Sequence, residues 1–255
     1  MDAAGIVDQL FNRAREADEF EYVCALLRIR GMEDEGWDPL EETQRLYNDI
    51  GSLMEAPLND YARVRLGLLL YSHLTEVDAV YIVLANMVEI AAGERCVMNP
   101  FDDLYRTQRQ GVFADRIPPS ARRVVNRLKE RATERGCDEL VQLLDSFFND
   151  AVRNAFFHSD YILHGDEFRS REARFIDENN VRTSSLKLNV IFDLINRSAD
   201  FFHSFMSTYG AHRLSYKESK VVRGRIGPGD AYEDITLLVH ATGGVYGFRS
   251  GGDTP

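Results

Sequence analysis

The sequence predicts a mainly α-helical protein with a small β-hairpin insertion and a short β-containing C-terminal extension. Apolar residues recur at helical spacing through the first two-thirds of the 255 residues. The pattern then changes to short β-favouring runs directly after His158, and again beyond residue 210. We therefore expect a helical domain over residues 1–210, with an insertion at about 160–187. A β-rich extension with a flexible tail follows over residues 211–255.

The first predicted helix has an apolar face and is stopped by Gly31. That face is formed by Phe20, Val23, Cys24, Leu27 and Ile29. A second helix begins at Asp38-Pro39, because aspartate caps a helix N-terminus and proline fits the first turn. Pro57 ends this second helix.

Residues 59–92 predict two helices joined near Thr75-Glu76. The following segment, residues 98–119, contains proline sites and polar residues, so we expect a connection with at most a short helix. A basic amphipathic helix then starts at residues 118–120 and ends at Gly136. Asp138 begins one further helix, which runs to about Phe157.

The predicted insertion consists of β-favouring residues around polar turns. Residues 161–168 form the first hairpin, and the runs 173–176 and 181–188 flank an Asn-Asn turn. Helical spacing returns from Leu188 to about Tyr209, where Gly210 is expected to stop the helix. In the extension, the short strands are expected at residues 220–226, 235–240 and 245–248. The tail frays from Ser250.

Composition excludes several classes of protein. Cys24, Cys96 and Cys137 are far apart and odd in number, so we expect no disulfide framework and a reducing cytosol. The N-terminus lacks the basic and apolar regions of a signal peptide. The longest apolar stretches, residues 66–71 and 80–85, fall far short of the roughly 20 residues that cross a bilayer. We expect a cytoplasmic protein with no membrane partner.

The net charge of −11 argues against a protein that coats nucleic acid in general. Nearly all of the excess lies in residues 1–60, which hold 15 acidic and 5 basic residues. Residues 101–230 hold 21 basic and 19 acidic residues, so the middle of the chain is locally compatible with a polyanion.

The candidate functional residues are Arg153, Asn154 and His158, at the end of a predicted helix. On an ideal helix Asn154 and His158 lie about 40° apart, whereas Arg153 and His158 lie about 140° apart. Asn154 can therefore support His158 on one face. Arg153 shares a site with His158 only if the helix end distorts or if two protomers meet across a two-fold axis.

Histidine and arginine suit the cleavage of a phosphodiester bond in RNA. Histidine titrates near neutrality and can take or give a proton. Arginine holds a phosphate through two donors and stabilises charge that develops on it. RNA supplies its own nucleophile, the 2′-hydroxyl, so this chemistry requires no metal or other cofactor.

The string VRNAFFHSDY resembles the signature of the HEPN (higher eukaryotes and prokaryotes nucleotide-binding) superfamily. That signature is an arginine, four to six residues and then a histidine, commonly with asparagine after the arginine. Arg153, Asn154 and His158 match it at the four-residue spacing. The resemblance implies a small up-down helical bundle that homodimerises and brings two motifs into one cleft. This chain departs from small members in its length, its acidic N-terminal arm and the insertion after His158.

Many members of the superfamily are metal-independent ribonucleases, often toxins or defence and RNA-processing effectors, and others are inactive binding or assembly modules. The leading expectation is therefore a metal-independent endoribonuclease that works by 2′-hydroxyl attack. His158 would be the general acid or base, Arg153 would bind the scissile phosphate, and Asn154 would orient one of them. Expected partners are a second copy of the chain, RNA, and a protein partner such as an antitoxin. The alternative is a non-catalytic dimeric module that binds a nucleotide or a protein.

Weaker hypotheses concern other charged residues. In a purely structural interpretation, Arg153 pairs with a neighbouring acid such as Asp150, and His158 is favoured by the helix dipole. His164 and Asp160 lie near the motif and are either a second acid–base pair or ordinary surface groups. Two basic sets either guide an RNA backbone or form solvated faces. They are Arg122, Arg123, Arg127, Lys129, Arg131 and Arg135 in the basic helix, and Arg169, Arg171 and Arg174 in the insertion.

Overall fold

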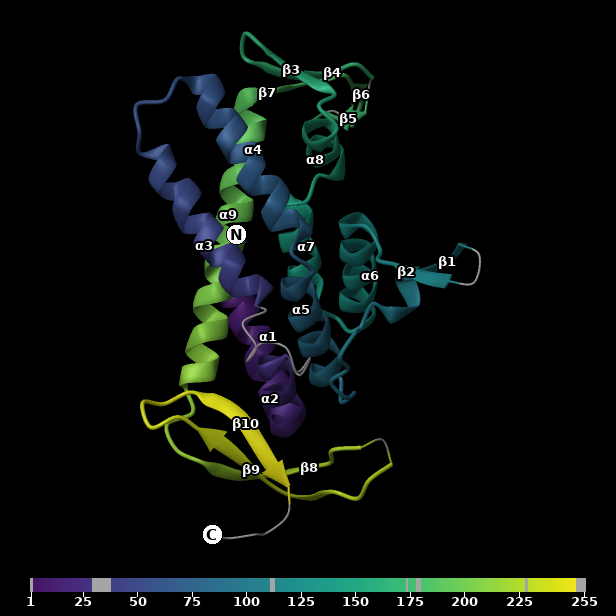
Figure 1. Ribbon diagram of the computed structural model, residues 1–255, viewed down its shortest axis with the longest axis vertical. Helices are drawn as coiled ribbons and strands as arrows, with labels where there is room; N and C mark the ends of the chain where they lie inside the picture. Colours follow the sequence, from purple (N-terminus) through teal and green to yellow (C-terminus); the bar gives the residue numbers. More distant parts are fainter. Residues whose placement is uncertain are drawn as a thin grey trace.

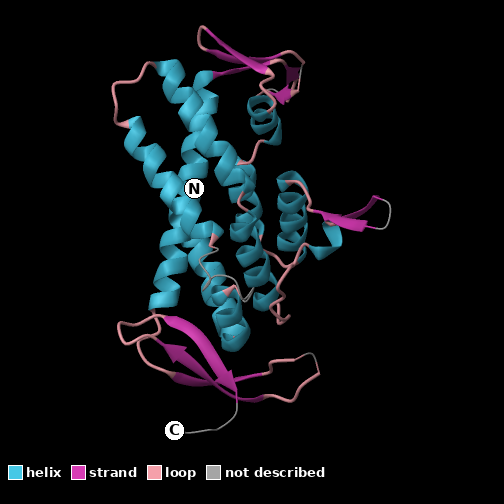
Figure 2. Ribbon diagram, in the orientation of Figure 1, coloured by secondary structure: helices cyan, strands magenta, loops and turns pink. Residues whose placement is uncertain are grey.

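The computed structural model describes residues 2–28, 38–110, 113–172, 174–177, 180–227 and 229–250. Helices form the body of the molecule, and small antiparallel sheets are attached to it (Figure 1; Figure 2). The longest helix, α9 (Leu188–Leu214), joins the inserted sheet at one end of the body to the C-terminal sheet at the other. The expectation of a mainly α-helical protein with an inserted and a C-terminal β element is confirmed.

The chain begins with two helices, α1 (Ala3–Ala17) and α2 (Glu19–Leu27). The sequence did not predict α1, which packs against α5 and α9 through an apolar stripe at helical spacing. Asp18 separates the two helices and caps α2 by accepting a hydrogen bond from the backbone N–H of Glu21. The predicted helix end at Ile29 and Gly31 lies outside the described residues.

The next three helices follow the sequence prediction closely. They are α3 (Pro39–Met54), α4 (Asp60–Glu76) and α5 (Asp78–Ala91). Asp38 caps α3 through the backbone N–H groups of Leu40 and Glu41, as its position before Pro39 predicts. Within the described residues, no single helix has the length and apolarity to cross a membrane. By length and composition alone, the bent pair α4–α5 passes that test.

A hairpin follows where the sequence suggested only a connection with a short helix. A 3₁₀ turn (Asp102–Leu104) leads into β1 (Arg106–Gln110) and β2 (Phe113–Ile117), which pair antiparallel and project from the body (Figure 1). The expectation for this segment was wrong in that respect. The first strand, RTQRQ, is wholly polar, and the described side chains of both strands, at residues 106–108 and 115–117, are exposed. The segment therefore lacks the apolar alternation that marks a strand.

The basic helix α6 (Ala121–Glu134) is terminated by Gly136, two residues beyond its last turn. The φ of +67° at Gly136 fits the predicted glycine cap. The single helix expected over residues 138–157 is in fact two, α7 (Asp138–Phe147) and α8 (Asp150–Phe157). The buried hydroxyl of Tyr71 fills the break. It donates to the carbonyl of Phe147 (2.9 Å) and accepts from the N–H of Asn149 (2.8 Å).

The insertion forms a three-stranded sheet and a small hairpin. The sheet has the order β3–β4–β7, with β3 (Tyr161–His164), β4 (Glu167–Ser170) and β7 (Ser185–Lys187) antiparallel. β5 (Phe175–Ile176) pairs with β6 (Arg182–Thr183). One face of the insertion covers a second hydrophobic core that it shares with α4, α8 and α9.

Helix α9 continues through Gly210 to Leu214, so the prediction that Gly210 stops it was wrong. A mid-helix glycine costs only about 1 kcal/mol, and the buried Tyr209 and His212 on either side anchor the last turns. The extension that follows is the antiparallel sheet β10–β9–β8, which packs on α2. Its strands are β8 (Lys220–Gly224), β9 (Glu233–Val239) and β10 (Val245–Ser250).

Candidate functional site

The three motif residues lie on α8, an eight-residue helix at the border between the helical body and the insertion (Figure 1). Asn149 begins the helix by accepting a hydrogen bond from the N–H of Val152. Val152 and Ala155 are fully buried, which fixes the rotation of the helix. Arg153 and Asn154 are consequently half-buried, and His158 is exposed at the C-terminal end.

A Schellman turn ends α8 at His158. The N–H of Asp160 donates to the carbonyl of Ala155 (2.9 Å), and the N–H of Ser159 donates to that of Phe156 (3.0 Å). Ser159 adopts the left-handed conformation this turn requires, with φ of +52°. The turn directs the chain into β3 and leaves the imidazole of His158 in solvent, where no described residue hydrogen bonds to it.

The side chain of Arg153 is held on several sides. Its guanidinium donates to the amide oxygen of Asn154 and forms an ion pair with Glu76, the last residue of α4. Its guanidinium carbon also lies 5.7 Å from the ring centroid of Phe157, a cation–π contact. Burial lowers the pKa of Arg153 from its usual value, although arginine stays protonated at any physiological pH.

Asn154 orients Arg153, not His158. Its amide oxygen accepts from Arg153, and its amide nitrogen donates to the carboxylate of Asp150 (2.9 Å). Its link to His158 is only the helical hydrogen bond from the N–H of His158 to the Asn154 carbonyl (3.0 Å). Asp150 in turn lies 3.9 Å from Arg122 on α6. The acid that pairs with Arg153 is therefore Glu76, where the structural interpretation of the sequence suggested Asp150.

Glu76 is a member of the site that sequence reasoning missed. It appeared only as the junction of two predicted helices, and nothing in the spacing of the motif points to a residue so far upstream. Two cavities, of about 190 and 590 Å³, open beside it. The walls of the larger cavity carry five carboxylates, from Asp38, Glu41, Glu42, Glu76 and Asp78. They also carry the guanidinium of Arg45, which pairs with Glu41 and Glu42.

The two basic sets are largely neutralised by neighbouring acids. On α6, Lys129 pairs with Asp145 (2.5 Å) and Arg135 pairs with Glu89 (2.9 Å). Arg127 and Arg131 likewise lie within 4.0 Å of acidic side chains. These pairs make α6 an ion-paired surface more than a continuous track for a phosphate backbone.

The three arginines of the second basic set, Arg169, Arg171 and Arg174, also lie within 4.0 Å of acidic side chains. Arg174 forms an ion pair with Asp160, and Arg169 lies 2.7 Å from Glu167. Asp160 is thus engaged by arginine and is not placed to orient a histidine. His164 is exposed on β3, where it lies opposite Glu167 in the register.

The described residues hold no group of three or more His, Cys, Asp or Glu side chains placed to bind a metal ion. Comparison of the chain with protein-family models, curated proteins and solved structures found no match. The candidate site therefore consists of Arg153, Asn154, His158 and Glu76.

Proposed function

We propose that this chain is a HEPN-like, metal-independent endoribonuclease that acts as a homodimer through Arg153 and His158. One observation carries the proposal: a guanidinium held in place by Asn154 and Glu76 lies on the short helix that ends at an exposed imidazole, and within the described residues no side chain hydrogen bonds to that imidazole. When two protomers meet across a two-fold axis, a fixed phosphate-binding guanidinium and an acid–base imidazole can share one cleft, which is the arrangement that cleavage of RNA requires.

In the proposed reaction, His158 accepts the proton of the ribose 2′-hydroxyl as the 2′-oxygen attacks the adjacent phosphorus. Arg153 binds the non-bridging phosphate oxygens and stabilises the charge that develops on them. The bond from phosphorus to the 5′-oxygen breaks, and that oxygen takes a proton from His158 of the partner subunit. The products are a 2′,3′-cyclic phosphate and a 5′-hydroxyl, with no oxidant, metal or cofactor consumed.

A second function is favoured by the ion pair of Arg153 with Glu76 and by the acidic cavity beside it. The guanidinium of Arg153 is already paired with the carboxylate of Glu76. The excess of acidic side chains around the cavity repels the phosphates of a polynucleotide. In this alternative the chain is a non-catalytic HEPN-like module that binds a nucleotide or a protein partner.

Cleavage of an end-labelled, mixed-sequence RNA in EDTA distinguishes the two functions. We expect the wild-type chain to cut the RNA, and His158→Ala and Arg153→Ala each to reduce the rate at least about a hundredfold. His164→Ala is the matched control, because His164 is also exposed and lies only a few residues away on β3. Equal cleavage by wild type and His158→Ala would refute the proposed site. No cleavage by folded wild type would favour the binding module.

A further inference from the structure

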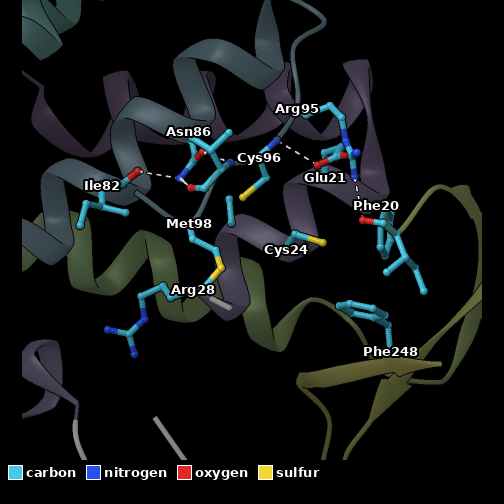
Figure 3. A pocket seen from close by; sticks show the side chains of 13 residues that line it. Phe20, Glu21, Cys24, Arg28, Ile82, Asn86, Arg95, Cys96, Met98 and Phe248 are labelled. Carbon is cyan, nitrogen blue, oxygen red and sulfur yellow. Dashed lines mark hydrogen bonds and ion pairs between the residues drawn. The ribbon is translucent and has the colours of Figure 1, made fainter. Parts of the chain in front are cut away.

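A cavity of about 240 Å³ lies between α2, α5, the segment 95–98 and the C-terminal extension (Figure 3). No residue of α8 lines it, so it is separate from the Arg153 and His158 site. Its apolar walls include Phe20, Cys24, Ile82, Cys96, Met98 and Phe248. Phe20 and Phe248 meet edge to face with their ring centroids 5.0 Å apart, so the cavity lies where β10 packs on α2.

The polar side chains in the wall bind other groups of the protein. Arg28 forms an ion pair with Asp38, and the dashed lines of Figure 3 mark the bonds of Glu21, Arg95 and Asn86. The buried carboxylate of Glu21 accepts from the Arg95 guanidinium (2.6 Å) and from the N–H of Cys96 (2.9 Å). The amide of Asn86 accepts from the N–H of Val97 (2.8 Å) and donates to its carbonyl (3.0 Å). These bonds hold residues 95–97 in place. They pair the charge of Glu21 and satisfy the amide of Asn86.

The two thiols in the wall are neutral and act as small apolar groups. Burial raises the pKa of Cys96 to about 12, and burial raises that of Cys24 further. A thiol of this kind is a poor nucleophile at neutral pH, so the cavity is suited to reversible binding.

The mouth of the cavity is apolar as well. Val97, Met98 and Ile226 line the cavity and are 48%, 63% and 46% exposed. A peptide inserted here would bury backbone N–H and C=O groups that Glu21 and Asn86 cannot satisfy, and a charged ligand would lose its hydration without an available partner. Both classes are disfavoured relative to an uncharged apolar molecule.

We propose that this cavity binds an uncharged apolar molecule about the size of a bicyclic aromatic ring system. A dry apolar cavity of roughly 150 Å³ is enough to bind benzene, so about 240 Å³ accommodates a second fused ring. A ligand in this position contacts α2, α5 and β10 together and stabilises the seating of the C-terminal sheet on the helical body.

Titration of the full chain with indole, followed by NMR of ¹³C-methyl methionine, tests the proposal. Met98 is the methionine in the cavity wall, and its signal is assigned with Met98→Leu. We expect a saturable shift of the Met98 methyl signal and no shift for Met54 on α3. Indole-3-acetate, which carries a charge, is expected to bind more than about tenfold more weakly.

Ala25→Leu fills the cavity from α2 and is expected to abolish the shift, while Ala14→Leu, at a buried position on α1 that does not line the cavity, is the matched control. Cys24→Met serves as a second filling variant in case Ala25→Leu does not fold. The proposal is overturned if indole causes no saturable Met98 shift, if all methionines shift in parallel, or if a folded filling variant responds like wild type.

Discussion

The guanidinium of Arg153 forms an ion pair with the carboxylate of Glu76, which ties α8 to the C-terminal end of α4. In the proposed nuclease, the scissile phosphate binds the same guanidinium. Glu76 therefore has two opposed effects: it positions Arg153 in the absence of RNA, and it competes with the phosphate when RNA binds.

Replacing Glu76 with glutamine separates these effects. Glu76→Gln is expected to tighten the binding of a short RNA about three- to tenfold, because the phosphate no longer displaces a carboxylate. The free energy of unfolding should fall by only about 1 kcal/mol, since Glu76 is partly exposed. Binding is measured in EDTA at fixed ionic strength on the His158→Ala background, which blocks cleavage.

Glu42→Gln is the control for this prediction, because it removes a charge from the same acidic cavity without contacting Arg153. An equal gain in affinity from both variants would mean that the effect is general electrostatic repulsion, and the specific competition at Arg153 would be wrong.

His158→Ala should leave the stability of the protein unchanged. The imidazole is exposed at the C-terminus of α8, and no described residue hydrogen bonds to it, so its removal should change the free energy of unfolding by no more than about 0.5 kcal/mol. Urea unfolding measures this directly. A loss of several kcal/mol would show that the histidine has a structural role.

The hydroxyl of Tyr71 is expected to stabilise the break between α7 and α8. Tyr71→Phe leaves the carbonyl of Phe147 and the N–H of Asn149 without this buried partner, which should cost about 1–3 kcal/mol. Tyr61→Phe removes a solvent-exposed hydroxyl bond to Gly165 and should cost less than about 0.5 kcal/mol. Equal losses from the two variants in urea unfolding would contradict this role of Tyr71.

The ion pair of Asp38 with Arg28 makes the stability of the protein depend on pH. Burial acts to raise the pKa of Asp38, but the hydrogen bond and charge of Arg28 outweigh it, and the net pKa is lowered. The stabilisation is therefore complete above the unfolded pKa of about 3.9 and is lost as the pH falls through the lower folded pKa.

Asp38→Asn keeps a capping side chain but removes the charge. We expect it to lower the free energy of unfolding at pH 7 by about 1–2 kcal/mol. The difference from wild type should shrink as the pH is lowered from about 5 toward 2, as followed by urea unfolding. A difference that does not change with pH would show that the pair does not couple stability to protonation.

The parts of the fold that were predicted correctly have local signals. Asp38-Pro39 and Gly136 sit at helix boundaries whose chemistry depends only on adjacent residues, so α3 and α6 were found. The break between α7 and α8 was missed because it depends on the Tyr71 hydroxyl, which comes from a distant helix. The prediction that Gly210 ends α9 was wrong because the burial of Tyr209 and His212 outweighs the low helix propensity of glycine.

The candidate site shows the same division. Arg153, Asn154 and His158 were chosen because their spacing is local, and the structure places Arg153 and Asn154 on α8 and His158 at its C-cap. The partners of each side chain depend on tertiary packing. The side chain of Asn154 binds Arg153 instead of His158, and Glu76 reaches the site from α4. Neither contact is indicated by the spacing of residues in the sequence.

The most direct test is to compare, in EDTA, an RNA oligonucleotide with the same oligonucleotide carrying a 2′-deoxyribose at the cleaved position. The proposed mechanism predicts that wild type cuts the RNA to a 2′,3′-cyclic phosphate and a 5′-hydroxyl, and that the deoxy-substituted position stays intact. Cleavage at the deoxy position, or product ends other than these, would contradict the central claim that Arg153 and His158 promote attack by the 2′-hydroxyl.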